Sequence, residues 1–292
     1  MDEHTRAPLP DGPVVVGTDG SVLATRAVLW AAEEAAARGR PLQILCAAHV
    51  DLLPDELTED VIRPLLETAA ERADTAALKA TGSFPGLTVT TSVSRGDPAE
   101  SLVEAAGTTG TVVVGSRGLG GFSSLLLGSV GRQVTRWATG PVVVVHGEPK
   151  APARTVLVGA RDSRDAVPVR FAAQYARRRD AALKVLSAWT LTHHLESMAP
   201  IVSSVRAVAE RNADRAAPLV AAVREEYPNL RVAEEVVQVP SAGGALVAAS
   251  AHVNLVVLGS RQADGPLSAP VGRVAQAVLE HAACPVALVP RG

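Results

Sequence analysis

The sequence predicts an α/β protein built from two fused domains, each with a five-stranded parallel sheet flanked by helices. Apolar runs of strand length alternate with alanine-rich stretches of helical period, which is typical of strand–helix–strand units. The pattern then occurs a second time, because residues 112–117 read VVVGSR and residues 256–261 read VVLGSR. This offset of 144 residues, from 112 to 256, also aligns Gly128 with Gly272 without a gap. A fused duplication is the simplest explanation.

The elements of the first copy follow from this alternation. We expect strands at residues 13–18, 42–49, 87–93, 111–115 and 141–146. Helices are expected between them, at residues 21–38, 61–81, 98–106 and 129–138. Residues 142–145 are four valines, and such an unbroken apolar run predicts a strand covered by helices on both faces.

The two copies meet in a short polar segment. A length of 292 residues is about twice that of a common domain. Near the start of each copy, residues 14–17 resemble residues 156–159. Residues 148–152 read EPKAP, which is typical of a proline-containing linker. We therefore expect one domain over residues 1–148 and a second over residues 153–292.

Composition argues against several classes of partner. The 28 basic and 30 acidic residues leave a net charge of -2, which offers no field for binding nucleic acid or a membrane. No run approaches the ~20 apolar residues of a membrane span, and the polar start of the sequence has no apolar signal core. We expect a cytoplasmic protein. Cys46 and Cys284 lack neighbours at metal-binding spacing and are expected to be reduced core thiols.

A glycine-rich loop follows the strand that ends at Gly115. After Gly118 come nine residues, and then Gly128 and Ser129 at the start of an expected helix. Glycine lets the backbone reach positive φ and approach a ligand, so that successive N–H groups can converge on phosphate oxygens. The helix N-terminus adds a positive dipole, and Ser129 either caps this helix or bonds a phosphate oxygen. The spacing fits neither a Walker loop nor the dinucleotide fingerprint.

The spacing Gly115-x2-Gly118-x9-Gly128-Ser129 resembles the ATP-binding signature of universal stress proteins. Four flanking segments agree with that family's pattern: residues 16–21 (VGTDGS), 48–50 (AHV), 96–98 (GDP) and 140–142 (GPV). The resemblance covers nearly the whole chain, once per copy. It implies two Rossmann-like domains in tandem, each with its last strand at the edge of its sheet.

The resemblance also implies that the first copy binds ATP, with Mg²⁺ bridging the phosphates and no metal ligand from the protein. It places Asp19 near the ribose, and Gly17 and Val50 around the adenine. The phosphates would lie along the loop, at Gly115, Arg117, Gly118, Gly128, Ser129 and Val130.

Physical chemistry leaves alternatives open at three of these positions. Asp19 could equally cap the helix that follows it, and Val50 could be an ordinary core residue. The Arg117 guanidinium could neutralise phosphate charge or remain a solvated loop side chain.

The second copy changes three of the contacts just described. It retains the first and third loop glycines as Gly259 and Gly272. Gln262 and Arg273 stand where the pattern has glycine and serine, and Arg161 stands opposite the aspartate. A residue forced into positive φ at position 262 would cost on the order of 1–3 kcal/mol.

Two interpretations of the second copy stay open. Arg161 cannot accept a hydrogen bond from a ribose hydroxyl, although the adjacent Asp162 could take over that role. Arg273, together with Arg261 of the loop, could hold an anion at the helix N-terminus. The second site is therefore either degenerate or an altered nucleotide site.

The leading functional hypothesis is a nucleotide-dependent switch or regulator in a stress response, acting on an unknown effector protein. No catalytic residues are predicted, because the loop offers no carboxylate to position water or Mg²⁺. A slow ATPase, an adenylate-transferring enzyme and a scaffold without nucleotide are the alternatives. Universal stress proteins commonly dimerise through the last strand. We therefore expect residues 141–146 and 285–289 to pair as an intramolecular pseudo-dimer, with a homodimer as a further possibility.

Overall fold

A computed structural model describes residues 11–52, 58–119, 127–147, 153–190, 201–260 and 271–291. At residues 52, 201–210, 212 and 213 the backbone alone is described. The chain divides into two compact units, which we call the N-terminal unit (Pro8–Gly147) and the C-terminal unit (Glu148–Gln262 with Val271–Gly292).

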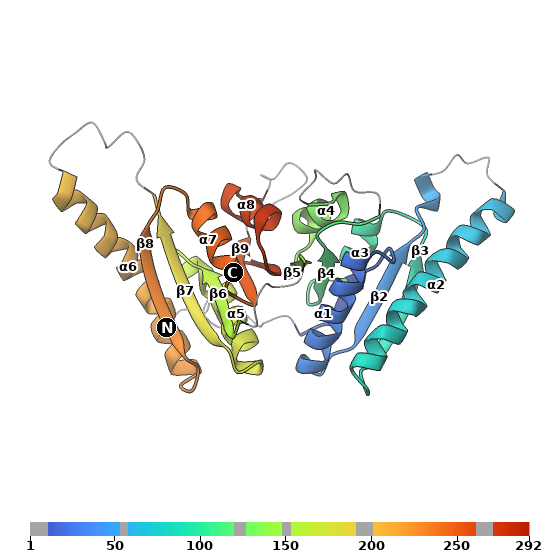
Figure 1. The fold of residues 1–292 in the computed structure, drawn as a ribbon, viewed down its shortest axis with the longest axis horizontal. Coiled ribbons are helices and arrows are strands. Elements are labelled where there is room, and N and C mark those ends of the chain that lie inside the picture. Colours follow the sequence, from blue (N-terminus) through green and yellow to red (C-terminus); the bar gives the residue numbers. More distant parts are fainter. Residues whose placement is uncertain are drawn as a thin grey trace. The chain divides into compact units, whose positions relative to one another are not determined.

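The N-terminal unit is a doubly wound α/β domain (Figure 1). Its elements are β1 (Val14–Gly17), α1 (Val22–Arg38), β2 (Leu42–Ala47), the 3₁₀ helix η2 (Val50–Leu52), α2 (Glu59–Ser83), β3 (Val89–Ser94), α3 (Pro98–Ala106), β4 (Thr111–Gly115), α4 (Ser129–Trp137) and β5 (Val142–Val145). The strands are all parallel, in the order β3-β2-β1-β4-β5. The predicted five-stranded sheet, with its last strand at one end of the order, is confirmed.

Helices cover the sheet in two pairs. α1 packs with α2 and α3 packs with α4, and both pairs contact the strands. The chain winds from β1 through β2 to β3 and then returns past β1 to β4 and β5. Because such crossovers are right-handed, the two pairs of helices lie on opposite faces of the sheet. The strands β1 and β5 are accordingly apolar: Val14, Val15 and Val16 of β1 are fully buried, and the valines of β5 are buried. The core lies between the sheet and each pair of helices.

The C-terminal unit repeats this architecture (Figure 1). Its elements are β6 (Thr155–Gly159), η3 (Ser163–Asp165), α5 (Ala166–Arg178), β7 (Ala182–Trp189), α6 (Ile201–Glu226), β8 (Val232–Gln238), α7 (Ala242–Ser250), β9 (Leu255–Ser260), α8 (Arg273–His281) and β10 (Val286–Pro290). The strands are again parallel, in the order β10-β9-β6-β7-β8. Two copies of one α/β domain are therefore present.

Most predicted elements form within two residues of their expected bounds, and the differences have local causes. β2 ends at Ala47 rather than at residue 49, because His49 adopts a left-handed φ of 55° and Val50 then begins η2. Asp97 of the GDP segment caps α3 by accepting hydrogen bonds from two backbone N–H groups, with Pro98 as the first helical residue. That segment therefore has a structural explanation as a helix start.

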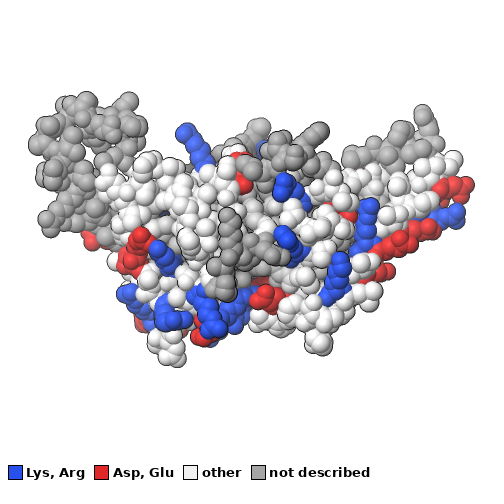
Figure 2. Space-filling view, in the orientation of Figure 1, with Lys and Arg blue, Asp and Glu red and all other residues white. Residues whose placement is uncertain are grey.

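Surface charge and thiols fit the composition. Acidic and basic side chains both lie on the visible face (Figure 2). Cys46 and Cys284 are buried and form no disulfide, and burial raises the pKa of the Cys284 thiol to about 12. Of the helices in the described ranges, none is long and apolar enough to cross a membrane.

Candidate functional site

The two loops singled out in the sequence meet at one edge of the N-terminal sheet. β1 and β4 are parallel neighbours, with Val14 opposite Thr111 and Val16 opposite Val113, so their carboxyl ends lie side by side. The strand order reverses here, because β2 follows on one side of β1 and β4 lies on the other. Open parallel sheets bind ligands in the crevice at such a point.

Gly17 and Gly115 allow helices to pack against the ends of these strands. A Cβ atom at Gly17 would lie 2.9 Å from Leu102 Cδ1 of α3, and one at Gly115 would lie 3.1 Å from the Leu23 carbonyl group of α1. A side chain at Gly115 would press on the backbone of α1, and one at Gly17 would require the buried Leu102 side chain to move. These two glycines therefore have a packing role that does not depend on a ligand.

Asp19 joins the two loops of the crevice. Its Oδ1 accepts a hydrogen bond from the Ser21 N–H at 2.9 Å, and its Oδ2 accepts one from the Leu119 N–H at 2.6 Å. Ser21 is the N-cap residue of α1, because its hydroxyl accepts a hydrogen bond from the Ala24 N–H at 3.1 Å. The alternative in which Asp19 caps this helix is therefore wrong. Its carboxylate holds the loop after β4 against the turn after β1.

Gly118 is required by space rather than by backbone conformation. A Cβ atom at this position would collide with Oδ2 of Asp19. The φ angle of Gly118 is outside the left-handed region, as are those of Gly115 and Gly128. The expectation that these glycines provide positive φ is therefore wrong. At Gly118, glycine is needed because a carboxylate occupies the place of its side chain.

The N-terminus of α4 forms the next part of the crevice. Gly128 is the N-cap residue, with φ −68° and ψ 165°, and its N–H donates to the Ser116 carbonyl at 2.8 Å. Ser129 is therefore the first helical residue, and its exposed side chain does not cap the helix. The first N–H groups of a helix have no carbonyl partner within it. Those of Ser129 and Val130 are accordingly placed to bind an anion.

The remaining predicted residues of this unit differ in exposure. Val50 is 5% exposed and follows the left-handed His49, a position that suits either a pocket wall or the core. Arg117 is exposed in the loop after β4. Residues 120–126 of this loop lie outside the described part of the chain.

A cavity of about 420 Å³ opens between α1, α2 and the two loops. One polar face of α2 lines it, at positions that recur every three or four residues. The lining residues are Thr18, Asp19, Gly20 and Leu119 of the loops, and Thr25, Thr68, Glu71, Arg72, Thr75, Ala76 and Lys79 of the helices. Sequence analysis missed the contribution of α2, because polar residues on a long helix usually form a solvated face.

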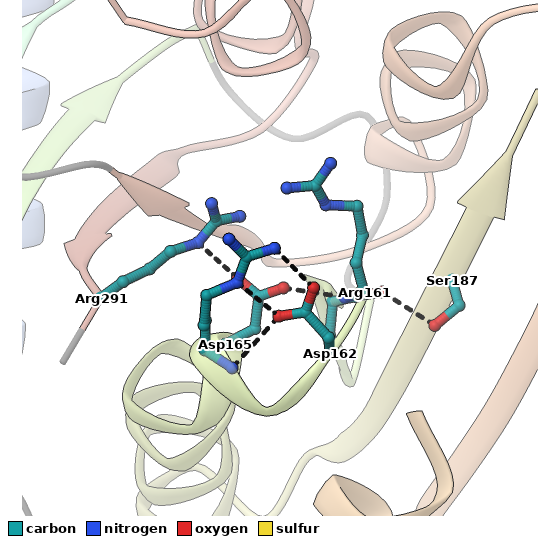
Figure 3. A network of polar contacts seen from close by, with 7 residues as sticks. Arg161, Asp162, Asp165, Ser187 and Arg291 are labelled. Atoms are coloured by element: carbon teal, nitrogen blue, oxygen red, sulfur yellow. Dashed lines mark hydrogen bonds and ion pairs between the residues drawn. The ribbon is translucent and has the colours of Figure 1, made fainter. Parts of the chain in front are cut away.

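The corresponding edge of the C-terminal unit carries a charged network (Figure 3). Asp165 is 1% exposed; its Oδ1 accepts a hydrogen bond from Arg291 Nε at 2.7 Å, and its Oδ2 accepts one from the Arg161 N–H at 2.8 Å. Asp162 accepts three hydrogen bonds from Arg164, from the backbone N–H, Nε and Nη2 at 3.2, 3.0 and 2.8 Å. These bonds, the side-chain ones first, lower the pKa of Asp162 to about 2.

The other residues predicted for the second site are placed as follows. Gly259 lies in β9, and a Cβ atom there would approach Arg291 Nε to 2.6 Å and Asp165 Oδ1 to 2.7 Å. Gly272 is the N-cap of α8, and Arg273 is its first residue, with an exposed side chain. Arg261 and Gln262 lie outside the described residues.

Arg164, Asp165 and Arg291 are the residues of this network that sequence reasoning missed. At the offset of 142 that aligns residues 14–17 with 156–159, Asp165 stands opposite Leu23. At the offset of 144, Arg291 stands opposite Gly147. The available signals were two charged residues of the second copy, one aligned with a leucine and the other with a glycine of the first copy. Both positions lie outside the loop pattern.

Comparison with known proteins identifies the domain that is repeated. The model of the universal stress protein family matches residues 12–146 and again residues 152–290. A universal stress protein of Mycolicibacterium smegmatis is 30% identical over 286 residues, which cover 94% of this chain and 96% of the relative. Universal stress protein Rv2005c of Mycobacterium tuberculosis is 32% identical over 290 residues, which cover 94% and 95%.

A solved structure agrees with this fold. The crystal structure of a universal stress protein from Archaeoglobus fulgidus superposes with a TM-score of 0.70 at 18% identity, and the alignment covers 97% of both chains. With the family model matching both halves, the chain belongs to the universal stress protein family and carries its domain twice in tandem.

Proposed function

We propose that the N-terminal unit binds ATP at the crevice between β1 and β4, and that ATP acts there as a switch in a stress response. The observation that supports this proposal is the hydrogen bond from the Leu119 N–H to Asp19 Oδ2, at 2.6 Å. It brings the two loops together at the sheet edge where α4 begins. Asp19 and Leu119 also line the cavity of about 420 Å³ beside α2, whereas the residues proposed to bind the phosphates and the adenine do not line it.

Each part of the crevice offers a different chemistry to the nucleotide. The N–H groups of Ser129 and Val130 would bind phosphate oxygens, and Arg117 would balance their charge. Mg²⁺ would be carried by the phosphates and would neutralise part of their charge. Asp19 would accept hydrogen bonds from the ribose hydroxyls, and Val50 with Gly17 would flank the adenine.

Asp19 also provides a physical link between ligand and loop. A ribose hydroxyl that donates to Oδ2 competes with the Leu119 N–H for the same oxygen. Nucleotide binding would then weaken the bond that holds the loop after β4, and the loop would change its preferred conformation. A ligand shifts such an equilibrium only by its difference in affinity for the two states. Competition at Asp19 supplies that difference.

Replacing Gly118 with valine tests the site, because any Cβ at this position collides with Asp19 Oδ2. Gly118→Val should lose ATP binding in isothermal titration calorimetry of nucleotide-free protein, while its far-UV circular dichroism stays unchanged. Gly82→Val on α2 is the matched control, since a Cβ there meets no atom within 4 Å. Equal ATP affinity in Gly118→Val and wild type would refute the site.

We also propose that the two units pair through β5 and β10 as an intramolecular pseudo-dimer in the cytoplasm. The support is that each is an apolar strand at one end of its own unit's order, and an apolar edge requires cover or a partner. The effector protein would then recognise the nucleotide-dependent state of this assembly.

A further inference from the structure

Among the described residues, basic groups outnumber acidic ones at the carboxyl edge of the C-terminal sheet. Arg161, Arg164 and Arg291 lie there with Asp162 and Asp165, and the guanidinium groups of Arg164 and Arg291 bond these two carboxylates. Arg164 is committed to Asp162 by its backbone N–H, Nε and Nη2. The ability to bind a further anion therefore rests on the other two arginines.

Arg291 is held in place through one of its five N–H donors. Among the residues that the structure describes, its guanidinium bonds Asp165, and it does so through Nε at 2.7 Å. The two terminal amino groups keep their donors for another acceptor. Asp165 is 1% exposed, whereas the Arg291 side chain is 19% exposed. The buried carboxylate thus fixes one side of a guanidinium whose other side can reach a ligand.

Arg161 supplies the second cation at this edge. Its backbone N–H donates to the other oxygen of Asp165, so the backbone of Arg161 and the guanidinium of Arg291 lie on the same carboxylate. Its side chain is exposed and, within the described ranges, forms no ion pair. Figure 3 shows this side chain extending away from the paired carboxylates. Its charge still lies close enough to Asp162 to contribute to that group's lowered pKa, after the larger effect of Arg164.

We propose that Arg161 and Arg291 form a binding site for a phosphate-bearing anion in the C-terminal unit, with Asp165 as the residue that positions Arg291. Guanidinium groups match phosphate oxygens in geometry and bind them with two parallel hydrogen bonds. Arg273, the first residue of α8, adds a third cation at the helix terminus that follows β9. This site uses side-chain cations, whereas the proposed N-terminal site uses backbone N–H groups.

The test is calorimetric titration of the full chain with inorganic triphosphate at low ionic strength, in wild type and in Gly118→Val. We expect about one equivalent to bind to the C-terminal unit in both proteins. Arg161→Gln should weaken that binding about tenfold, the loss of one charge-assisted hydrogen bond. Arg291→Lys, which leaves Asp165 a cationic partner and so preserves folding, should also weaken it. Arg154→Gln is the matched control, because Arg154 is exposed at the opposite end of β6.

Titrating Gly118→Val with ATP, triphosphate and adenosine shows whether the site recognises the phosphate chain or a nucleotide. ATP binding no more tightly than triphosphate indicates a site for the phosphate chain alone, and tighter ATP binding indicates a nucleotide; adenosine should not bind in either case. Absence of saturable triphosphate binding would overturn the proposal and would mean that the pair with Asp165 fills this edge. An equal loss in Arg154→Gln would overturn it too, because it would reveal general electrostatic attraction. Neither result bears on ATP binding by the N-terminal unit.

Discussion

Replacing Asp19 with alanine removes the acceptor of two backbone N–H groups, those of Ser21 and Leu119. A hydrogen bond to a charged group contributes about 1.5–3 kcal/mol when its partners are buried. Asp19 is half-buried and Leu119 is exposed, so water replaces part of each bond and we expect a loss of about 1.4 kcal/mol at Leu119. That corresponds to a tenfold faster exchange of the Leu119 amide hydrogen if this bond limits its opening.

Hydrogen exchange measured by NMR checks the local effect, and calorimetry checks the functional one. Without a carboxylate for the ribose hydroxyls, ATP affinity should also fall, by up to about tenfold, because in wild type the ribose contact gains only its excess over the Leu119 bond that it displaces. Asp214→Ala, which removes an exposed carboxylate from α6 in the other unit, is the control and should change neither quantity. Asp19→Ala with unchanged exchange at Leu119 and unchanged ATP affinity would refute both the role of the Asp19–Leu119 hydrogen bond and the ribose contact.

Three further predictions concern the number of ATP sites, the Asp162 carboxylate and the pairing of the two units. Titration of nucleotide-free protein with micromolar ATP at physiological ionic strength should give near one equivalent per chain. In the C-terminal unit Arg161 stands in place of the ribose acceptor, and salt weakens the attraction of that unit's exposed cations for ATP. Two equivalents of similar affinity would contradict this prediction. The lowered pKa of Asp162, about 2 when folded, means that its carboxylate stabilises the fold above pH ~4 and that this contribution is lost as the pH falls toward 2. Denaturant unfolding across that range should show a smaller loss in Arg164→Gln than in wild type, and equal losses would exclude this ion pair as the cause. A solution structure of the chain should show β5 and β10 paired, and finding them far apart would rule out the pseudo-dimer.

The strands and helices were predictable because each is encoded locally. Val14 to Val16 and the valines of β5 form apolar runs of strand length, and such runs are typical of strands in a parallel sheet that is covered on both faces. Helix starts carried similar local signals, such as the serine at position 21 and Asp97 before Pro98. Local chemistry of this kind determines where elements begin, and the repeat then determined their order.

Partners distant in sequence could not be predicted in the same way. Leu119 lies 100 residues from Asp19, and Arg291 lies 126 residues from Asp165. Each contact forms only because parallel strands bring their carboxyl ends to one edge. The cavity face of α2 was missed for the same reason, since the polar residues of that helix gain a role only through the loops placed beside them.

The structure also gives a common cause to two differences that the sequence presented as independent. Gly118 must be glycine because Asp19 Oδ2 occupies the position of its Cβ, and its backbone φ imposes no such demand. In the second copy Arg161 stands opposite Asp19, so the aspartate that occupies the place of a Cβ at Gly118 has no counterpart at the aligned position. The strain of 1–3 kcal/mol expected from positive φ therefore has no basis in the equivalent residue of the first copy. We therefore expect that replacing the aspartate by arginine removes the demand for glycine at the loop position. The same replacement exchanges the proposed ribose acceptor for a cation.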